Sequence, residues 1–154
     1  MKRLFSLTVT LLFCVSGNFI AKSFPTQVFD RYGNIRWEEE QARLDNFAIF
    51  LMQNPSFNGY IFVWAGRRAC RGEAQARAVR AKNYLVRFRK IAENRIVWQD
   101  EGYNDEPETI LQPMERGKPM LSFDSPVAPR DVQLRENCRH GLPVGKRRVK
   151  SRRT

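Results

Sequence analysis

The most regular pattern of apolar and polar positions lies between residues 59 and 88. Residues 60–65 form an unbroken apolar and aromatic run that stops at Gly66. Because this run is short and rich in β-branched and aromatic residues, it favours a strand covered on both faces. After a basic turn, apolar residues recur at helical spacing and form one stripe, made of Ala74, Ala78, Ala81, Leu85 and Phe88. The pattern predicts a central strand, a turn and a long amphipathic helix that runs to about Ala92.

Two elements precede the central strand. Residues 28–35 mix apolar and polar side chains and contain Gly33-Asn34, which indicates an opening strand or hairpin arm that ends in a turn. Residues 37–53 have helical periodicity, and Pro55 ends this helix. The acidic triplet at residues 38–40 suits the positive end of the helix dipole. Consecutive helical residues point in different directions, so helix-start stabilisation is the stronger reading and a cation site the weaker one.

Two further strands follow the second helix. Residues 95–99 and 108–111 have strand patterns, with an acidic loop at residues 102–107 between them and Pro113 closing the last strand. The order of elements is therefore β-α-β-α-β-β. This order predicts an α+β sandwich with a mixed four-stranded sheet and two main helices on one face. The strand-helix-strand crossover should make its two strands parallel neighbours.

The N-terminus has the layout of a signal peptide. Lys2 and Arg3 precede an apolar run at residues 4–15, and the hydrophobicity then falls. A membrane-spanning helix needs about 20 apolar residues, so a transmembrane segment is the weaker reading. Cleavage after Ser23 and cleavage after Gly17 both fit. We expect residues 1–23 to be removed and the protein to be exported to the periplasm or the extracellular space, with no transmembrane segment after processing.

The charge is unevenly distributed along the 154 residues, whose formal net charge is +11. Residues 139–154 contain seven basic residues and no acid, whereas residues 24–138 carry 17 basic against 16 acidic residues. We expect residues 24–116 to form one α/β domain and residues 117–154 an irregular, proline-containing basic tail. Within the domain, residues 67–95 are strongly basic and the acids cluster elsewhere, which predicts a basic face and an acidic end.

Two cysteines remain after processing, Cys70 in the central turn and Cys138 near the tail. An exported chain folds where thiols are oxidised, so a Cys70–Cys138 disulfide is the first expectation. Two free or intermolecular thiols are the alternative, because spacing alone does not fix pairing. A zinc site that uses Cys138 and His140 is weaker, since a structural zinc normally needs four ligands.

Several short motifs together resemble a known family. These are residues 48–51 of the first helix, the central strand that ends at Gly66, the Arg77-Ala78 and Tyr84-Leu85 pairs, and the strand that opens with Arg95-Ile96. In these features residues 28–114 resemble the OmpA-like C-terminal domain of bacterial envelope proteins. The resemblance implies an α/β fold and a link to peptidoglycan.

This chain departs from the family at the ligand site. Peptidoglycan-binding members have a Thr-Asp pair soon after the central strand and an Asn before a Leu-Ser, and the Asp and the helix Arg hold the diaminopimelate of the stem peptide. Here Arg67-Arg68 occupy the Thr-Asp position, and of the family's motif only Arg77 carries over. A ligand site of Arg67, Arg68, Arg71 and Arg77 would favour anionic groups. The alternative for Arg77 is an exposed pair with Glu73, four residues earlier.

The sequence contains no catalytic motif. It has one histidine, His140 in the tail, and neither a nucleophile elbow nor a phosphate-binding glycine loop. We expect a non-enzymatic envelope module without cofactors that contacts peptidoglycan or another anionic envelope polymer. The alternative is a secreted polycation whose basic tail binds nucleic acid or an anionic membrane surface, and a tail that only solubilises the protein is an equally valid reading.

Overall fold

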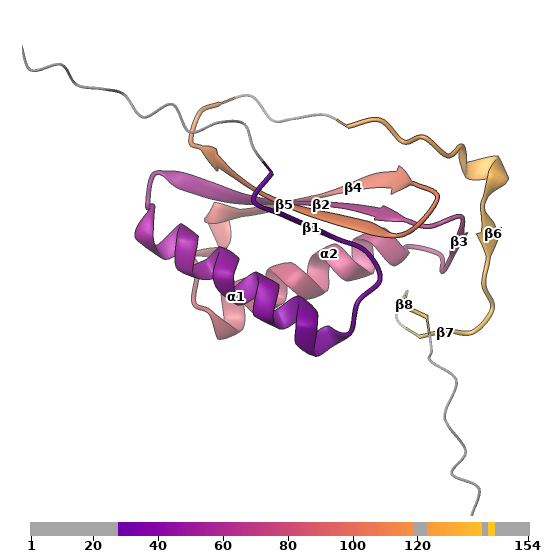
Figure 1. Ribbon diagram of the computed structural model, residues 1–154, viewed down its shortest axis with the longest axis horizontal. Helices are drawn as coiled ribbons and strands as arrows, with labels where there is room; N and C mark the ends of the chain where they lie inside the picture. The colour runs from indigo at the N-terminus through magenta and orange to yellow at the C-terminus, as the bar shows by residue number, and fades with distance from the viewer. Residues whose placement is uncertain (1–27, 119–122, 140–141, 144–154) are drawn as a thin grey trace, which may run out of the picture.

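The computed structural model describes residues 28–118, 123–139 and 142–143. It contains a four-stranded mixed sheet with both main helices on one face (Figure 1), so the predicted fold class is confirmed. The expected signal peptide (residues 1–23) and the basic end of the tail (residues 144–154) lie outside the described residues. Within the described part of the chain, no helix is long and apolar enough to cross a membrane.

The sheet has the strand order β1-β5-β2-β4. Strands β2 and β4 are parallel neighbours, as the crossover predicted, and β5 is antiparallel to both β1 and β2. The elements are β1 (Asp30–Tyr32), α1 (Trp37–Gln53), β2 (Phe57–Ala65), α2 (Glu73–Asn83), β4 (Ile96–Tyr103) and β5 (Glu108–Glu115). The helix predicted over residues 37–53 is α1 itself.

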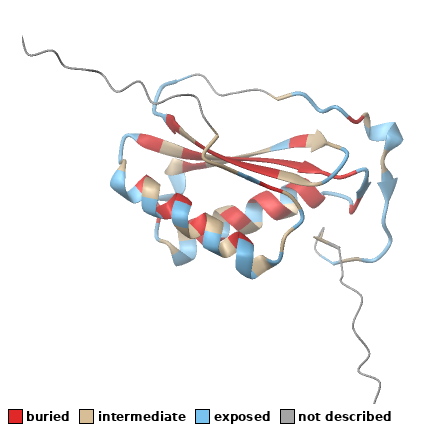
Figure 2. Cartoon of the chain, in the orientation of Figure 1, coloured by how far each residue is buried: buried red, intermediate tan, exposed pale blue. Residues whose placement is uncertain are grey.

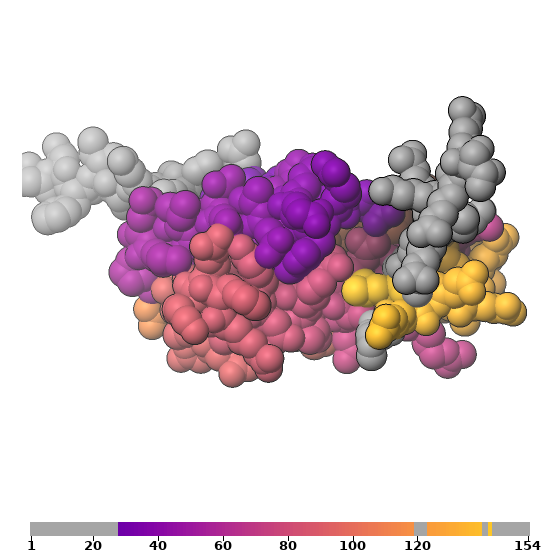
Figure 3. Space-filling model, turned by 90° about the horizontal axis from the view of Figure 1, so that it is seen from below, coloured from indigo at the N-terminus to yellow at the C-terminus, as the bar shows by residue number. Residues whose placement is uncertain are grey.

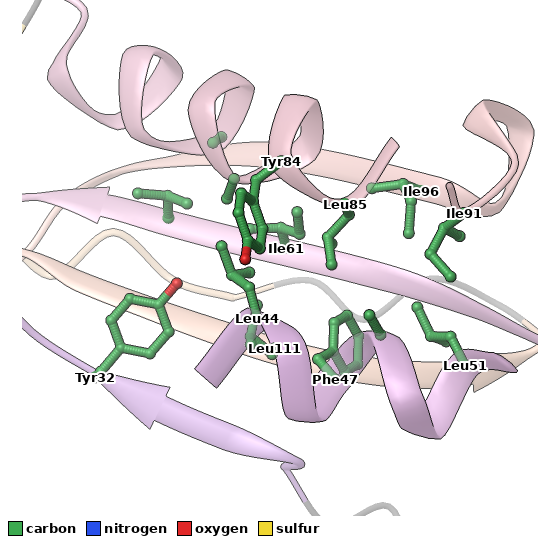
Figure 4. Close-up of a cluster of buried hydrophobic side chains, with 14 of the residues drawn as sticks. Tyr32, Leu44, Phe47, Leu51, Ile61, Tyr84, Leu85, Ile91, Ile96 and Leu111 are labelled. Atoms are coloured by element: carbon green, nitrogen blue, oxygen red, sulfur yellow. The ribbon is translucent and has the colours of Figure 1, made fainter. Parts of the chain in front are cut away.

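The main core lies between the sheet and the two helices. Leu44, Phe47 and Leu51 form one face of α1, and they meet Ile61 of β2 and Leu85 in the space shown in Figure 4; all five side chains are fully buried. Each fully buried side chain of this kind contributes roughly 1.5–3 kcal/mol. Figure 2 shows the same layering, with buried residues along the sheet and on the inner sides of the helices. Helix packing therefore fixes how α1 and α2 lie on the sheet.

The opposite face of the sheet carries a smaller aromatic core. Phe62 and Trp64 of β2 are buried there with Ile110 of β5. Phe123 packs on them, with ring centroids 4.8 Å from Phe62 and 5.3 Å from Trp64. The indole Nε1 of Trp64 donates a hydrogen bond to the carbonyl oxygen of Asp124 at 3.2 Å. A segment beyond the expected domain boundary thus covers the face that has no helices.

We call residues 123–139 the strap. It was expected to be irregular, and much of it is extended, but it also contains short ordered elements. These are the 3-10 turn η3 (Pro129–Asp131), β6 (Gln133–Leu134) and β7 (Cys138–Arg139), and β7 pairs with β8 (Leu142–Pro143). Strand β6 pairs in parallel with β3 (Arg68–Ala69) in the turn before α2. The sequence analysis did not predict β3 or β6, because each of these strands has only two residues and no periodicity of its own.

Strand β5 continues past Pro113, which was expected to end it. The carbonyl oxygen of Leu111 accepts a hydrogen bond from the amide of Phe29, so this residue's backbone groups point towards β1. Backbone groups two residues later point to the same side, at a position beyond the first residue of β1. Among the described residues, no strand therefore pairs with the backbone of Pro113 on this side, and a strand tolerates proline at such a position.

The second helix was expected to run unbroken to Ala92, and this prediction is wrong. Helix α2 ends at Asn83 and continues as a π-helical turn, η1 (Tyr84–Phe88), and a 3-10 turn, η2 (Glu93–Arg95), leads into β4. The wider turn changes the direction of the side chains that follow it. As a result Phe88, which was expected on the buried stripe, is 72% exposed.

The close packing of Gly59 gives a test of the main core. A Cβ at this position would lie 2.7 Å from Cδ1 of Leu51 and 2.9 Å from Cε1 of Phe47. We expect Gly59→Ala to lower the free energy of unfolding by about 1–3 kcal/mol, the usual cost of overpacking, in urea denaturation. Wild type, measured under the same conditions, is the reference. Equal stability of wild type and Gly59→Ala would contradict this account of the core.

Candidate functional site

The candidate site lies at the edge of the sheet where the parallel strands β2 and β4 end. Strand β2 ends at Ala65 and leads through Gly66 into the basic turn, and β4 ends beside it. The β4–β5 loop is anchored to this turn: Asn104 donates its amide hydrogen to the carbonyl oxygen of Ala65 at 2.8 Å, and Arg67 donates to that of Asp105 at 3.3 Å. The carboxyl ends of parallel strands are a common position for ligand sites.

A pocket of about 380 Å³ opens at this edge. Four parts of the chain form it: the basic turn with the start of α2, the β4–β5 loop, the strap, and Asn34 from the segment between β1 and α1. Four arginines and four acids line it together with neutral residues. The charged lining residues are Arg67, Arg68, Arg77, Arg135, Glu73, Asp105, Glu106 and Asp131.

The predicted site residues are only partly brought together. Arg67, Arg68 and Arg77 line the pocket, whereas Arg71 is exposed and does not. Arg67 forms an exposed ion pair with Asp105. Arg68 has no acidic partner among the described residues and is free to meet a ligand.

Arg77 forms a buried ion pair with Glu73. It donates from Nε at 3.0 Å and from Nη2 at 2.8 Å to Oε1 of Glu73, and Nη2 also reaches Oδ1 of Asn34 at 3.0 Å. Oε2 of Glu73 accepts the amide hydrogen of Cys70 at 2.9 Å. The pairing with Glu73 was one of the two alternatives for Arg77, but the expected exposure was wrong, since the two residues are 7% and 2% exposed. Most of the donor capacity of this guanidinium is therefore used inside the protein.

Sequence reasoning missed the acids and the strap residues of the pocket. The acids were expected at a separate end of the molecule, but the parallel β2–β4 pairing brings Asp105 and Glu106 next to the basic turn. Asp131 and Arg135 reach the pocket because β6 pairs with β3. The expected disulfide was the one signal that the residues before Cys138 return to the central turn. With its acids, the pocket suits a ligand that carries both carboxylate and ammonium groups.

The Cys70–Cys138 disulfide is present, as predicted, and joins residues 68 positions apart. Cys70 is fully buried in the turn that leads into α2, so the bond fixes the end of the strap to this turn. His140, the other ligand considered for zinc, lies outside the described residues. The described parts of the chain contain no group of three or more His, Cys, Asp and Glu side chains that could hold a metal ion.

A second buried cluster joins β1, α1 and α2 near the pocket. Glu40 accepts hydrogen bonds from the Tyr32 hydroxyl at 3.3 Å and from Arg80, whose guanidinium lies over the Trp37 ring at 4.6 Å. Burial raises the pKa of Glu40 above its ordinary value, although the nearby Arg80 and Arg77 oppose this shift. The pKa of Tyr32 lies far above its ordinary value, mainly because the hydroxyl is buried and secondly because the charge of Glu40 is close. The hydroxyl therefore stays protonated and can donate a hydrogen bond. Glu40 thus binds the layers together, in addition to lying in the first turn of α1.

The disulfide generates a prediction about the pocket wall. Gln133 donates its amide hydrogen to the carbonyl oxygen of Arg67 at 2.7 Å, and Arg135 donates to that of Ala69 at 2.9 Å. We expect Cys70→Ala/Cys138→Ala to lower the free energy of unfolding by up to about 4 kcal/mol, the chain-entropy value for a loop of this length. Hydrogen exchange of the Gln133 and Arg135 amides should become much faster, while amides in the centre of β2 stay protected. Unchanged exchange at Gln133 and Arg135 would show that the strap holds its place without the disulfide.

Comparison with known proteins finds no matching family model and no matching curated protein. The resemblance to the OmpA-like domain therefore depends on the short motifs in the sequence and remains a prediction.

Proposed function

We propose that this protein is an exported, non-catalytic module of the cell envelope that binds peptidoglycan, or another envelope polymer with carboxylate and amine groups, through the pocket beside the basic turn. The observation that carries the proposal is the composition of this pocket. It holds guanidinium and carboxylate groups in a space of about 380 Å³. Stem peptides of peptidoglycan carry the complementary groups.

Some of the charges in the pocket are not used within the protein. Arg68 and Arg135 have no acidic partner, and Glu106 and Asp131 have no basic partner, among the described residues. A guanidinium can bind a carboxylate through two parallel hydrogen bonds, and a carboxylate can accept bonds from an ammonium group. These four side chains are therefore the groups that we assign to ligand binding.

The disulfide and the N-terminal sequence support the proposed compartment. Disulfides persist in oxidising environments such as the periplasm and the extracellular space. The Cys70–Cys138 bond supports export, in agreement with the signal-peptide pattern of residues 1–23. The proposed location is accordingly periplasmic or extracellular.

The alternative function is that of a secreted polycation. Residues 144–154 carry six basic residues and no acid. Such a segment binds nucleic acid or anionic membranes by releasing counterions, with strong salt dependence and little specificity. In this alternative the folded domain is only a carrier, and the pocket has no part in binding.

The pocket can be tested with two arginines whose loss should not affect the fold. We expect Arg68→Gln/Arg135→Gln to weaken binding of the protein to purified peptidoglycan sacculi by at least tenfold, because each charged hydrogen bond is worth about 1.5–3 kcal/mol. Both side chains are exposed, so the melting temperature should stay the same. Binding is measured by co-sedimentation at moderate salt. Arg77 is a poorer target, because losing its buried ion pair with Glu73 would lower the stability of the protein as well as its affinity for the ligand.

Two controls separate the alternatives. Arg71→Gln removes the charge of an exposed neighbouring arginine that does not line the pocket, and it should leave sacculus binding within about twofold of the wild type. Removal of residues 144–154 should leave sacculus binding in place and reduce binding to double-stranded DNA. Loss of sacculus binding on removal of these residues, with no effect of the pocket variant, would favour the polycation.

A further inference from the structure

The turn after α2 exposes an aromatic side chain among cations. Phe88 is 72% exposed, the highest value among the large exposed apolar residues of the described chain. Its neighbours in the sequence are Arg87, Arg89 and Lys90. The Phe88 ring stacks on Tyr84, with centroids 5.6 Å apart and an interplanar angle of 24°. Tyr84 is itself buried, so this contact holds the exposed ring in a fixed position.

The backbone of this turn is unusual in two respects. It is π-helical: Arg89 donates its amide hydrogen to the carbonyl oxygen of Tyr84, five residues earlier, at 3.2 Å. Ile91 donates to the carbonyl oxygen of Leu85, six residues earlier, at 3.1 Å, and this bond closes the end of the turn. Lys90 has a φ of 59°, the left-handed conformation that glycine adopts far more easily at a helix end. The chain thus has a cation where glycine would be the more stable choice. π-Helical turns are frequent at functional sites.

This turn lies beside the second half of α1. Asp45 of α1 accepts hydrogen bonds from Arg89, and in Figure 3 the two segments lie side by side on one face of the molecule. Ile49 lies one helical turn after Asp45, and Met52 lies almost one turn further. Their exposed fractions are 51% and 53%. Three of the five large exposed apolar residues of the described chain therefore lie on these two neighbouring segments.

The charge of this surface is positive. Its acids are already paired: Asp45 with Arg89, and Glu93 with Lys82 at 3.4 Å. Arg87 and Lys90 are exposed and have no acidic partner among the described residues. The surface therefore combines apolar side chains with two free cations.

We propose that this surface, which we call the Phe88 face (Ile49, Met52, Arg87, Phe88 and Lys90), docks on an anionic phospholipid bilayer. Apolar side chains on a basic surface bind at the headgroup level, where lysine and arginine attract anionic lipids. Ile49 and Met52 favour a bilayer over nucleic acid, because aliphatic side chains do not stack on bases as aromatic rings do. Docking through two cations and three apolar side chains is weak and reversible.

The Phe88 face is separate from the pocket. The pocket lies at the start of α2 and the Phe88 face follows its end, and the 11 residues of this helix extend over roughly 16 Å. The proposal does not depend on the function of the pocket or on residues 144–154. A single molecule can hold an envelope polymer at one end and rest on a membrane at the other.

The test places a fluorescent reporter at the centre of the surface. Oxidised full-length mature protein carrying Phe88→Trp is mixed with vesicles of equal parts phosphatidylcholine and phosphatidylglycerol that contain brominated lipid. We expect the fluorescence of its added indole to be quenched. The quenching of the native tryptophans, measured in the wild-type protein, is subtracted as background. Leu134→Trp is the matched control, because Leu134 is 52% exposed on β6 beside the pocket and should show no extra quenching. The basic residues 144–154 can bring either variant to a vesicle, but only insertion of the Phe88 face produces the difference.

Charge variants provide an independent measurement. Arg87→Gln/Lys90→Gln should weaken vesicle binding about tenfold, whereas Arg68→Gln/Arg71→Gln removes the same charge elsewhere and should change it about twofold or less. Lys90→Gly separates function from stability: it relieves the left-handed backbone, so the melting temperature should stay the same or rise while vesicle affinity falls several-fold. A purely structural role for Lys90 would leave affinity unchanged.

Three results would overturn the proposal. The first is equal quenching of the Phe88→Trp and Leu134→Trp variants. The second is a response of the Phe88→Trp indole to single-stranded DNA but not to vesicles, which would assign the surface to nucleic acid. The third is a dimer in the absence of vesicles that Phe88→Ser dissociates, which would assign it to a second copy of the chain. Sacculus binding should be the same in all Phe88 variants, so failure here is distinct from failure of the pocket proposal.

Discussion

The arrangement of the candidate site depends on the buried carboxylate of Glu73. One of its oxygens accepts the amide hydrogen of Cys70 and the other holds Arg77. Glu73 is 2% exposed, so water cannot replace either partner. Removing one member of a buried ion pair typically costs about 3–5 kcal/mol, because the remaining charge is left without compensation. This carboxylate therefore fixes the turn, the start of α2 and the buried half of the disulfide in one arrangement.

The strap follows from that arrangement. The fixed turn presents the short strand β3, on which β6 pairs, and the disulfide holds the chain just beyond it. At its other end the strap crosses β4 at Gly102, where a Cβ would lie 2.7 Å from Oγ of Ser125. Just before Ser125, Phe123 covers the aromatic residues Phe62 and Trp64 of β2. The strap is thus part of the fold, even though it has no periodicity of its own.

Sequence reasoning succeeded where local pattern and packing agree. The bounds of α1, the central strand, the parallel crossover and the disulfide partners all follow from periodicity, helix-end residues or compartment chemistry. It failed where a tertiary contact decides the outcome. Strand β5 continues through Pro113 because β1 does not extend opposite this residue. Arg77 is buried because Glu73 and Asn34 accept its hydrogen bonds. The acids of the pocket were visible in the sequence, but their position depends on which strands are neighbours.

The charged side chains at the two ends of α2 are paired to different extents. Before the helix, the acids come from three different parts of the chain and face the arginines, so the charges lie inside or around a pocket and can orient a ligand with both signs. After the helix, Asp45 and Glu93 are already paired, and within the described ranges Arg87 and Lys90 have no acidic partner beside the exposed apolar side chains. A nearly neutral domain can therefore carry one selective site and one positive surface. The pocket and the Phe88 face differ because of where the ion pairs lie, and the net charge of the domain does not show this difference.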